Sequence, residues 1–135
     1  ATLPVKPSVT TTSTMPRAVL DSARIHPAVR ERIAGHQRAI VDEVQRAVGE
    51  HAVVVVGMRG NPFPKKARRA LDAAGIAHHD LDYGSYFSDW RRRNALKMWT
   101  GWPTLPMVFV RGTLVGGADD LIALIESGEL KRMLA

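Results

Sequence analysis

The stretch that decides the fold is "WPTLPMVFVRGTLVGGADDL", which runs from Trp102 to Leu121. Its centre holds two apolar runs around Arg111-Gly112, and this pattern predicts two strands joined by a turn. Pro106 stands at the start of the first strand, where proline is tolerated and where a cis bond would leave the backbone of Leu105 open to an extended ligand. Two glycines then lead into a helix that we expect to begin near Ala118, and the free backbone N–H groups of a helix start attract carboxylates.

A second informative stretch, "VVVVGMRGNPFPKKARRAL", precedes it and runs from Val53 to Leu71. The four valines predict a buried strand over residues 53–57, followed by a helix over about residues 62–74. Asn61 is placed to cap that helix, and Pro62 suits its first position. The helix dipole would attract negative charge at this turn, although Asn-Pro is also a good capping pair in any protein.

The rest of the chain predicts alternating helices and strands. We expect helix from about residue 17 to 48 with a break at Gly35, a short strand over residues 77–81, a helix from Ser85 or Tyr86 to Trp99, and a helical C-terminus. In the helix before Trp99, Phe87, Trp90 and Leu96 are expected to pack inward. This order predicts an α/β domain with a mixed sheet. By composition, residues 1–16 are a flexible tail and residues 17–50 a helical extension.

Composition limits the chemistry of the chain. It has 135 residues, no cysteine and a net charge of +6, from 19 Lys+Arg against 13 Asp+Glu. Without cysteine there is no disulfide, no thiolate metal site and no thiol nucleophile. His78 and His79 are adjacent, so in a strand they point to opposite faces, and we expect no metal site. The positive balance favours anionic partners, and we expect a soluble, cytoplasmic protein without a membrane span.

Taken together, these motifs resemble the glutaredoxin family of the thioredoxin fold. "NPFPKKARRAL" is similar to the family's Cys-Pro-Tyr-Cys motif and the helix after it, with Asn61 and Pro64 at the two cysteine positions. "WPTLPMVFVRGTLVGGADDL" resembles the Trp-Pro-Thr-x-Pro segment, the hairpin and the Gly-Gly-x-Asp of the monothiol branch. The resemblance covers residues 51–135 and implies a mixed four-stranded sheet flanked by helices.

The resemblance also implies a site for glutathione. The backbone of Leu105, beside a cis Pro106, would pair with the cysteinyl unit, and Ala118 and Asp119 would meet the γ-glutamyl carboxylate. Arg59 and Arg93 would meet the glycyl carboxylate. The glutathione-binding residues expected in this way are Arg59, Asn61, Phe63, Arg93, Leu105, Pro106, Gly117, Ala118 and Asp119. Trp99 and Trp102 would flank the approach to the groove.

The family's catalytic residue does not carry over to this chain. Thiol–disulfide exchange needs a thiolate, and neither Asn61 nor Pro64 can supply one. The same loss removes the protein thiolate through which monothiol members bind an iron–sulfur cluster, so we expect none held in that way.

Three functions remain open from the sequence. The first is a glutathione-binding, thiol-redox-inactive module that acts through an unknown protein partner, with a role in redox homeostasis. The second is a transferase or reductase that uses the thiol of bound glutathione, with Asn61 as hydrogen-bond donor to its thiolate. The third is a vestigial groove whose basic surface binds an acidic protein or nucleic acid; without a recognised motif, nucleic acid is the partner we expect least. The oligomeric state stays open.

Overall fold

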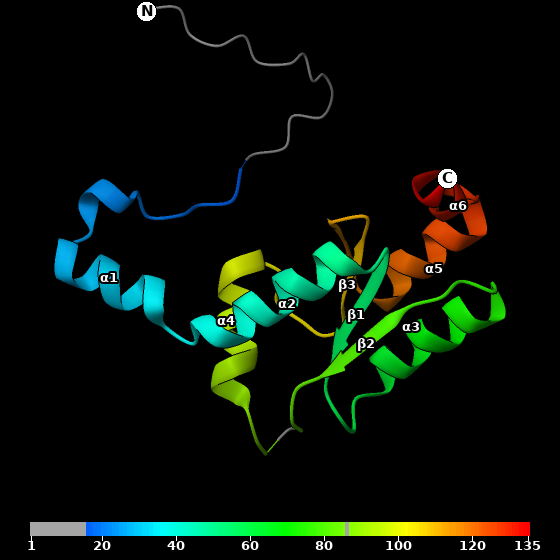
Figure 1. The fold of residues 1–135 in the computed structure, drawn as a ribbon, viewed down its shortest axis with the longest axis horizontal. Helices are drawn as coiled ribbons and strands as arrows, with labels where there is room; N and C mark the ends of the chain where they lie inside the picture. The colour runs from blue at the N-terminus through cyan, green and yellow to red at the C-terminus, as the bar shows by residue number, and fades with distance from the viewer. Residues whose placement is uncertain (1–15, 86) are drawn as a thin grey trace, which may run out of the picture.

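The computed structural model describes residues 16–85 and 87–135. Its centre is a mixed sheet in which β1 runs parallel to β2 and antiparallel to β3, while β3 and β4 form an antiparallel hairpin (Figure 1). In space the strands follow the order β2-β1-β3-β4. The strands are β1 (Val53–Gly57), β2 (His79–Asp82), β3 (Met107–Val110) and β4 (Thr113–Gly116). This confirms the predicted four-stranded mixed sheet and the hairpin that turns at Arg111-Gly112.

Helices cover both faces of the sheet. Residues of α2 and α4 share one buried cluster with the sheet, and residues of α3, α5 and α6 share the other. The helices are α1 (Pro27–Gly35), α2 (Arg38–Glu50), α3 (Pro62–Ala73), α4 (Trp90–Thr100), α5 (Ala118–Ser127) and α6 (Glu129–Leu134). The result is a three-layer arrangement with the sheet in the middle.

The four valines of β1 explain why this strand is apolar without alternation. Successive side chains of a strand point to opposite faces. Val54 and Val56 therefore enter the cluster with α2 and α4, while Val53 and Val55 enter the cluster with α3 and α5. All four are at most 1% exposed, as expected for a strand buried on both faces.

The start of α4 differs from the prediction. The helix begins at Trp90, not at residue 85 or 86, and it is preceded by a left-handed residue, Asp89, at φ 58°; Tyr86 lies outside the described residues. Leu96 is buried as expected, but Phe87 is 97% exposed and Trp90 is 55% exposed. The inward placement of both rings was wrong. Phe87 lies in a turn before the helix, and Trp90, six residues before the buried Leu96, lies about 120° away from it around the helix.

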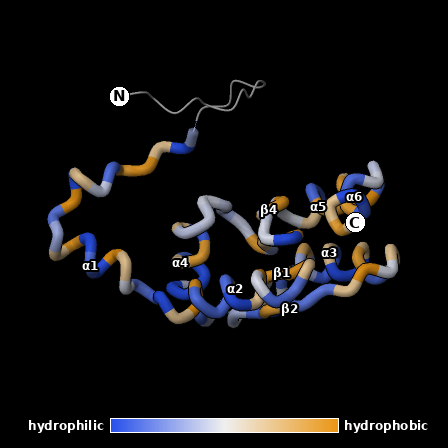
Figure 2. The backbone as a smooth tube through the Cα atoms, turned by 45° about the horizontal axis from the view of Figure 1, so that its top comes forward, coloured by the Kyte–Doolittle hydropathy of each residue, from blue (hydrophilic) through white to orange (hydrophobic). Residues whose placement is uncertain are grey.

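The two N-terminal helices differ in how far they pack on the domain. Two helices meet near Gly35 as predicted, because Gln37 adopts a left-handed conformation between them. The second, α2, buries Ile40, Val41 and Val44, whereas α1 buries no residue. Figure 2 shows apolar and polar residues alternating along α1. The expected flexible tail lies outside the described residues, except for Pro16. Among the described residues, no helix has the length and apolar character needed to cross a membrane.

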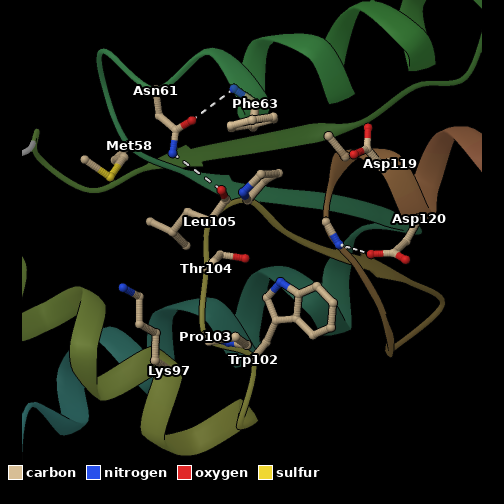
Figure 3. Close-up of a pocket in the computed structure, with 13 residues that line it drawn as sticks. Met58, Asn61, Phe63, Lys97, Trp102, Pro103, Thr104, Leu105, Asp119 and Asp120 are labelled. Carbon is tan, nitrogen blue, oxygen red and sulfur yellow. Dashed lines mark hydrogen bonds between the residues drawn. The ribbon is translucent and has the colours of Figure 1, made fainter.

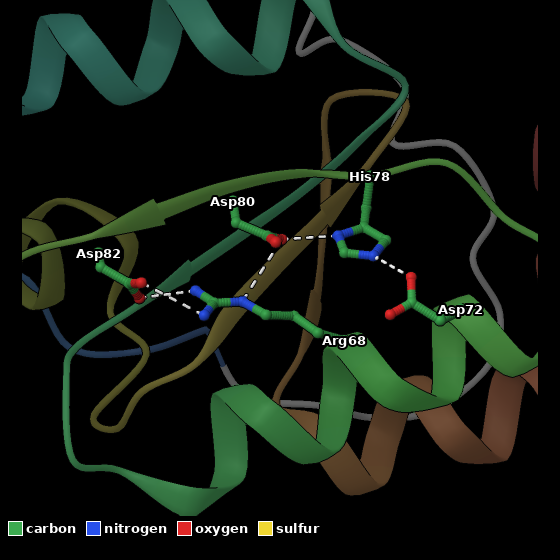
Figure 4. A network of polar contacts seen from close by, with 5 residues as sticks. All are labelled: Arg68, Asp72, His78, Asp80 and Asp82. Atoms are coloured by element: carbon green, nitrogen blue, oxygen red, sulfur yellow. Dashed lines mark hydrogen bonds and ion pairs between the residues drawn. The ribbon is translucent and has the colours of Figure 1, made fainter.

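An ion network joins α3 to the edge strand β2 (Figure 4). The Arg68 guanidinium contacts Asp82 at 2.6 Å and Asp80 at 3.4 Å. The His78 ring lies between Asp80, at 2.7 Å, and Asp72, at 2.8 Å. Burial by itself would lower the pKa of His78, but its hydrogen bonds to the two carboxylates and their charges outweigh burial and raise the pKa above the ordinary 6.5.

This network predicts a pH-dependent contribution to stability. Because the pKa of folded His78 is raised, its contribution is complete below pH 6.5 and is lost as the pH rises through the folded pKa. We expect His78→Gln to cost about 1 kcal/mol at pH 5.5, allowing for the solvent around Asp72, and less at pH 8.5. Urea unfolding of both proteins between these pH values measures the difference. The exposed His36→Gln is the control, and an equal cost of His78→Gln at both pH values would contradict the prediction.

Candidate ligand groove

A groove of about 500 Å³ lies where the start of α3, the start of the β3 strand and the start of α5 meet (Figure 3). Seven of the nine expected glutathione residues line it: Asn61, Phe63, Leu105, Pro106, Gly117, Ala118 and Asp119. The Leu105–Pro106 bond is cis, as the resemblance implied. Trp102 also lines the groove, whereas Trp99 does not and stacks on Phe109 instead.

Close packing at the end of β1 fixes the position of α3 beside the groove. A Cβ atom at Gly57 would lie 2.7 Å from Cβ of Pro64. Only glycine therefore lets this first turn of α3 approach the strand so closely.

Asn61 is buried, and both ends of its carboxamide are engaged within the protein. Its Oδ1 accepts a hydrogen bond from the Phe63 N–H at 2.9 Å, which confirms the predicted helix cap. Its Nδ2 donates to the Leu105 carbonyl at 3.4 Å. The side chain thus joins the start of α3 to the segment that leads into β3, as the dashed lines in Figure 3 show.

The start of α3 therefore offers few donors to an anion. Of the N–H groups that a helix start leaves unpaired, Pro62 and Pro64 have none and that of Phe63 is taken by Asn61. The start of α5 is different. Its Gly117 N–H donates to the Asp120 carboxylate at 3.0 Å, but the N–H groups of Ala118 and Asp119 have no acceptor among the described residues.

The carboxylate of Asp119 already has a partner. It accepts a hydrogen bond from Lys66 Nζ at 2.9 Å, with both side chains more than half exposed. An exposed pair of this kind contributes about 1 kcal/mol at most. Asp119 can therefore exchange Lys66 for a ligand cation at small cost.

The two arginines expected at the groove do not line it. Arg93 is 6% exposed, and its guanidinium donates to the carbonyls of Tyr83, at 3.0 Å, and Ser88. Arg59 is exposed, and its backbone N–H donates to the carbonyl oxygen of Gly84. The cation that does line the groove is Lys97, which rises from α4 on the side opposite the start of α3 (Figure 3). Lys97 is not among the residues expected from the sequence, although its position four residues after Arg93, one helical turn nearer to Trp102, was a usable signal.

Comparison with known proteins decides the family. The Glutaredoxin family model matches residues 53–115. A "Glutaredoxin-like protein" of Dictyostelium discoideum is 44% identical over 98 residues, which cover 73% of this chain and 80% of that protein. The chain belongs to the glutaredoxin family. Monothiol glutaredoxin-S17 of Arabidopsis thaliana is 35% identical over 98 residues, 69% of this chain and 20% of that longer protein.

A solved structure agrees with this membership at the level of the fold. The buckwheat glutaredoxin–glutathione complex superposes with a TM-score of 0.63 at 22% identity, over 73% of this chain and 90% of the other. The sheet and the flanking helices are therefore those of a glutaredoxin.

This member of the family has no cysteine at all. At the two motif positions the helix cap Asn61 and the buried Pro64 stand in place of thiols. Among the described residues, no group of three or more His, Asp or Glu side chains is arranged to hold a metal ion. The groove can bind and orient a ligand, but the chain adds no thiolate to it.

Proposed function

We propose that this domain is a redox-silent binding module that holds glutathione, or a similar anionic peptide, without covalent attachment, and works through a protein partner. The observation that carries the proposal is the convergence in one groove of unpaired N–H groups, an open backbone segment and a cation. Its volume suits a small ligand. The buckwheat relative of the same fold was solved as a glutathione complex, which supports this choice of ligand.

The three features match the three parts of the tripeptide. The N–H groups of Ala118 and Asp119, at the positive end of α5, suit the γ-glutamyl carboxylate. The Leu105 N–H has no acceptor among the described residues and suits the cysteinyl carbonyl. Lys97 suits the glycyl carboxylate, so it takes the part that the sequence assigned to Arg59 and Arg93.

Asn61 favours binding over turnover at this groove. Its amide already donates to Leu105, and the two prolines of α3 leave the nearby helix start poor in N–H groups. A thiolate needs such donors or a nearby cation to lower its pKa. We therefore expect the thiol of bound glutathione to stay protonated near neutral pH, which favours the module over the glutathione-dependent enzyme.

A titration of the isotope-labelled full chain with glutathione, followed by amide chemical shifts, tests the proposal. We expect localised, saturable shifts at Leu105, Ala118 and Asp119. S-methylglutathione should produce the same shifts, because the proposal gives the thiol no role in binding. Absence of shifts at about 10 mM ligand, a concentration far above the dissociation constant of a specific small-ligand site, would refute glutathione as the ligand.

A pair of lysine variants sharpens the test. We expect Lys97→Gln to weaken glutathione binding at least about fivefold, because a charge-assisted hydrogen bond to the ligand is lost. Lys65→Gln is the matched control, since Lys65 is an exposed residue of α3 outside the groove lining. Equal weakening by both variants would show that only the net charge matters and would remove Lys97 from the site.

A further inference from the structure

The outer side of α4 carries aromatic and polar side chains that the described chain leaves uncovered. Phe87, just before the helix, is 97% exposed, and Trp90 and Met98 are 55% and 60% exposed. Arg91 and Asn94 are also exposed, and the helical spacing from Trp90 to Met98 gathers these side chains on one side. We call Phe87, Trp90, Arg91, Asn94 and Met98 the α4 face.

The charge of the α4 face is positive. None of its five residues is acidic, and the neighbouring carboxylate, Asp89, is paired with Arg92 at 3.6 Å. The exposed Arg59 lies near the residues that precede α4, because its backbone N–H donates to the carbonyl oxygen of Gly84 at 2.8 Å. Gly84 in turn packs against Ser88 and Asp89. With a net charge of +6 on the whole chain, this surface favours a polyanion.

The aromatic rings narrow the kind of polyanion. The Arg91 guanidinium lies over the Trp90 ring, 5.1 Å from its centroid. An exposed ring beside an arginine offers a π-surface to a base and a cation to a phosphate. The two rings and Arg91 follow one another at the start of α4, so that stacking surfaces and a cation lie together. This pairing fits bases and phosphates.

We propose that the α4 face binds single-stranded nucleic acid, with Trp90 and Phe87 stacking on bases and Arg91 pairing with the phosphates. Residues 90–98 span about 12 Å of helix, which is room for a few nucleotides. From the sequence, nucleic acid is the partner expected least, because no recognised binding motif is present and the aromatic rings are placed in the core. Their exposure reverses that expectation, and the proposal does not depend on what the groove binds.

Fluorescence anisotropy with labelled 15-mers of rU and dT and with a 15-base-pair duplex, using the full chain, tests this proposal. We expect the single strands to bind more tightly than the duplex, because only unpaired bases can stack on the rings. The two single strands distinguish RNA from DNA, and tight binding of either supports the proposal. Preference for the duplex would overturn it.

Three variants locate the binding. The double variant Phe87→Ala/Trp90→Ala should weaken single-strand binding at least about tenfold, since each lost stacking contact has a large effect. Arg91→Gln should weaken single-strand binding and make the negative slope of log K against log salt shallower by about 0.7, because one phosphate contact is lost. Lys65→Gln removes a charge of the same sign from α3 and should change the affinity much less. All the altered side chains are exposed, so circular dichroism should show unchanged folding.

Two further results would overturn the proposal. One is equal weakening by Arg91→Gln and Lys65→Gln with no effect of the double variant, which would indicate diffuse attraction to the net charge. The other is equally tight binding of poly-L-glutamate, weakened by the double variant to the same degree, which would assign the α4 face to acidic proteins.

Discussion

Replacing Asn61 with cysteine is expected to give this protein a reactive thiol that it now lacks. The Phe63 N–H, which donates to Asn61 Oδ1 at 2.9 Å, would become available to the Sγ atom at the positive end of α3. A thiol at a helix start commonly has a pKa of roughly 7 or below, against about 8.5 for a free cysteine. The rate of alkylation by iodoacetamide as a function of pH measures that pKa directly.

The matched control is Ser127→Cys. Ser127 is exposed and is the last residue of α5, where the helix dipole has the opposite sign and does not stabilise a thiolate. Alkylation at pH 7 should be about tenfold faster for the cysteine at position 61. The loss of the asparagine cap should cost about 1 kcal/mol of stability. Equal pKa values for the two thiols would show that α3 with its two prolines no longer activates a thiol.

The same variant tests the groove independently. If glutathione binds as proposed, Asn61→Cys should catalyse the reduction of 2-hydroxyethyl disulfide by glutathione. The thiolate of residue 61 would attack the glutathione sulfur of the mixed disulfide between glutathione and 2-mercaptoethanol and release 2-mercaptoethanol. A second glutathione thiolate would then attack the glutathione sulfur of the protein mixed disulfide, forming glutathione disulfide and releasing the protein thiolate. A low thiol pKa without this activity would mean that the helix start is intact but the glutathione groove is not.

The fold was accessible from the sequence because local and global signals agree in it. The Val53–Val56 run, the Gly112 turn and the Gly116-Gly117 pair each permit few structures, and each appears where it was expected. Seven groove residues were also anticipated, because motif positions on neighbouring strand and helix ends carry their backbone geometry with them. What the sequence could predict was therefore mainly where the backbone goes.

Side-chain placement around α4 could not be predicted in the same way. Whether Phe87 is helical depends on the residue at which α4 begins. That residue is set by the left-handed backbone of Asp89 and the turn before it. Trp90 is helical, but its spacing of six residues from the buried Leu96 places it about 120° away around the helix, on the exposed side. Lys97 was missed for a related reason: on a helix, the rotation about its axis decides which of two basic residues one turn apart reaches a groove.

Arg93 is the residue for which sequence and structure disagree most, and its replacement separates the two accounts. Its guanidinium is almost fully buried, and it donates to the carbonyls of Tyr83 and Ser88. No carboxylate of the described residues lies within ion-pair distance of it. The side chain thus holds the segment between β2 and α4 against the start of the helix.

We expect Arg93→Met to lower the free energy of unfolding by about 2–4 kcal/mol, because two buried carbonyl groups lose a charged donor that methionine cannot replace. Urea unfolding measures this loss, and Arg91→Met is the matched control, since Arg91 is exposed two residues earlier and should cost less than about 0.5 kcal/mol. Under conditions where Arg93→Met remains folded, its glutathione affinity should stay within about twofold of the parent, whereas Lys97→Gln should keep its stability and lose affinity. A stable Arg93→Met protein with strongly weakened glutathione binding would instead place Arg93 at the ligand, as the family resemblance implied. The opposite behaviour of the two residues would show that, one turn apart on α4, one cation holds the fold together and the other faces the groove.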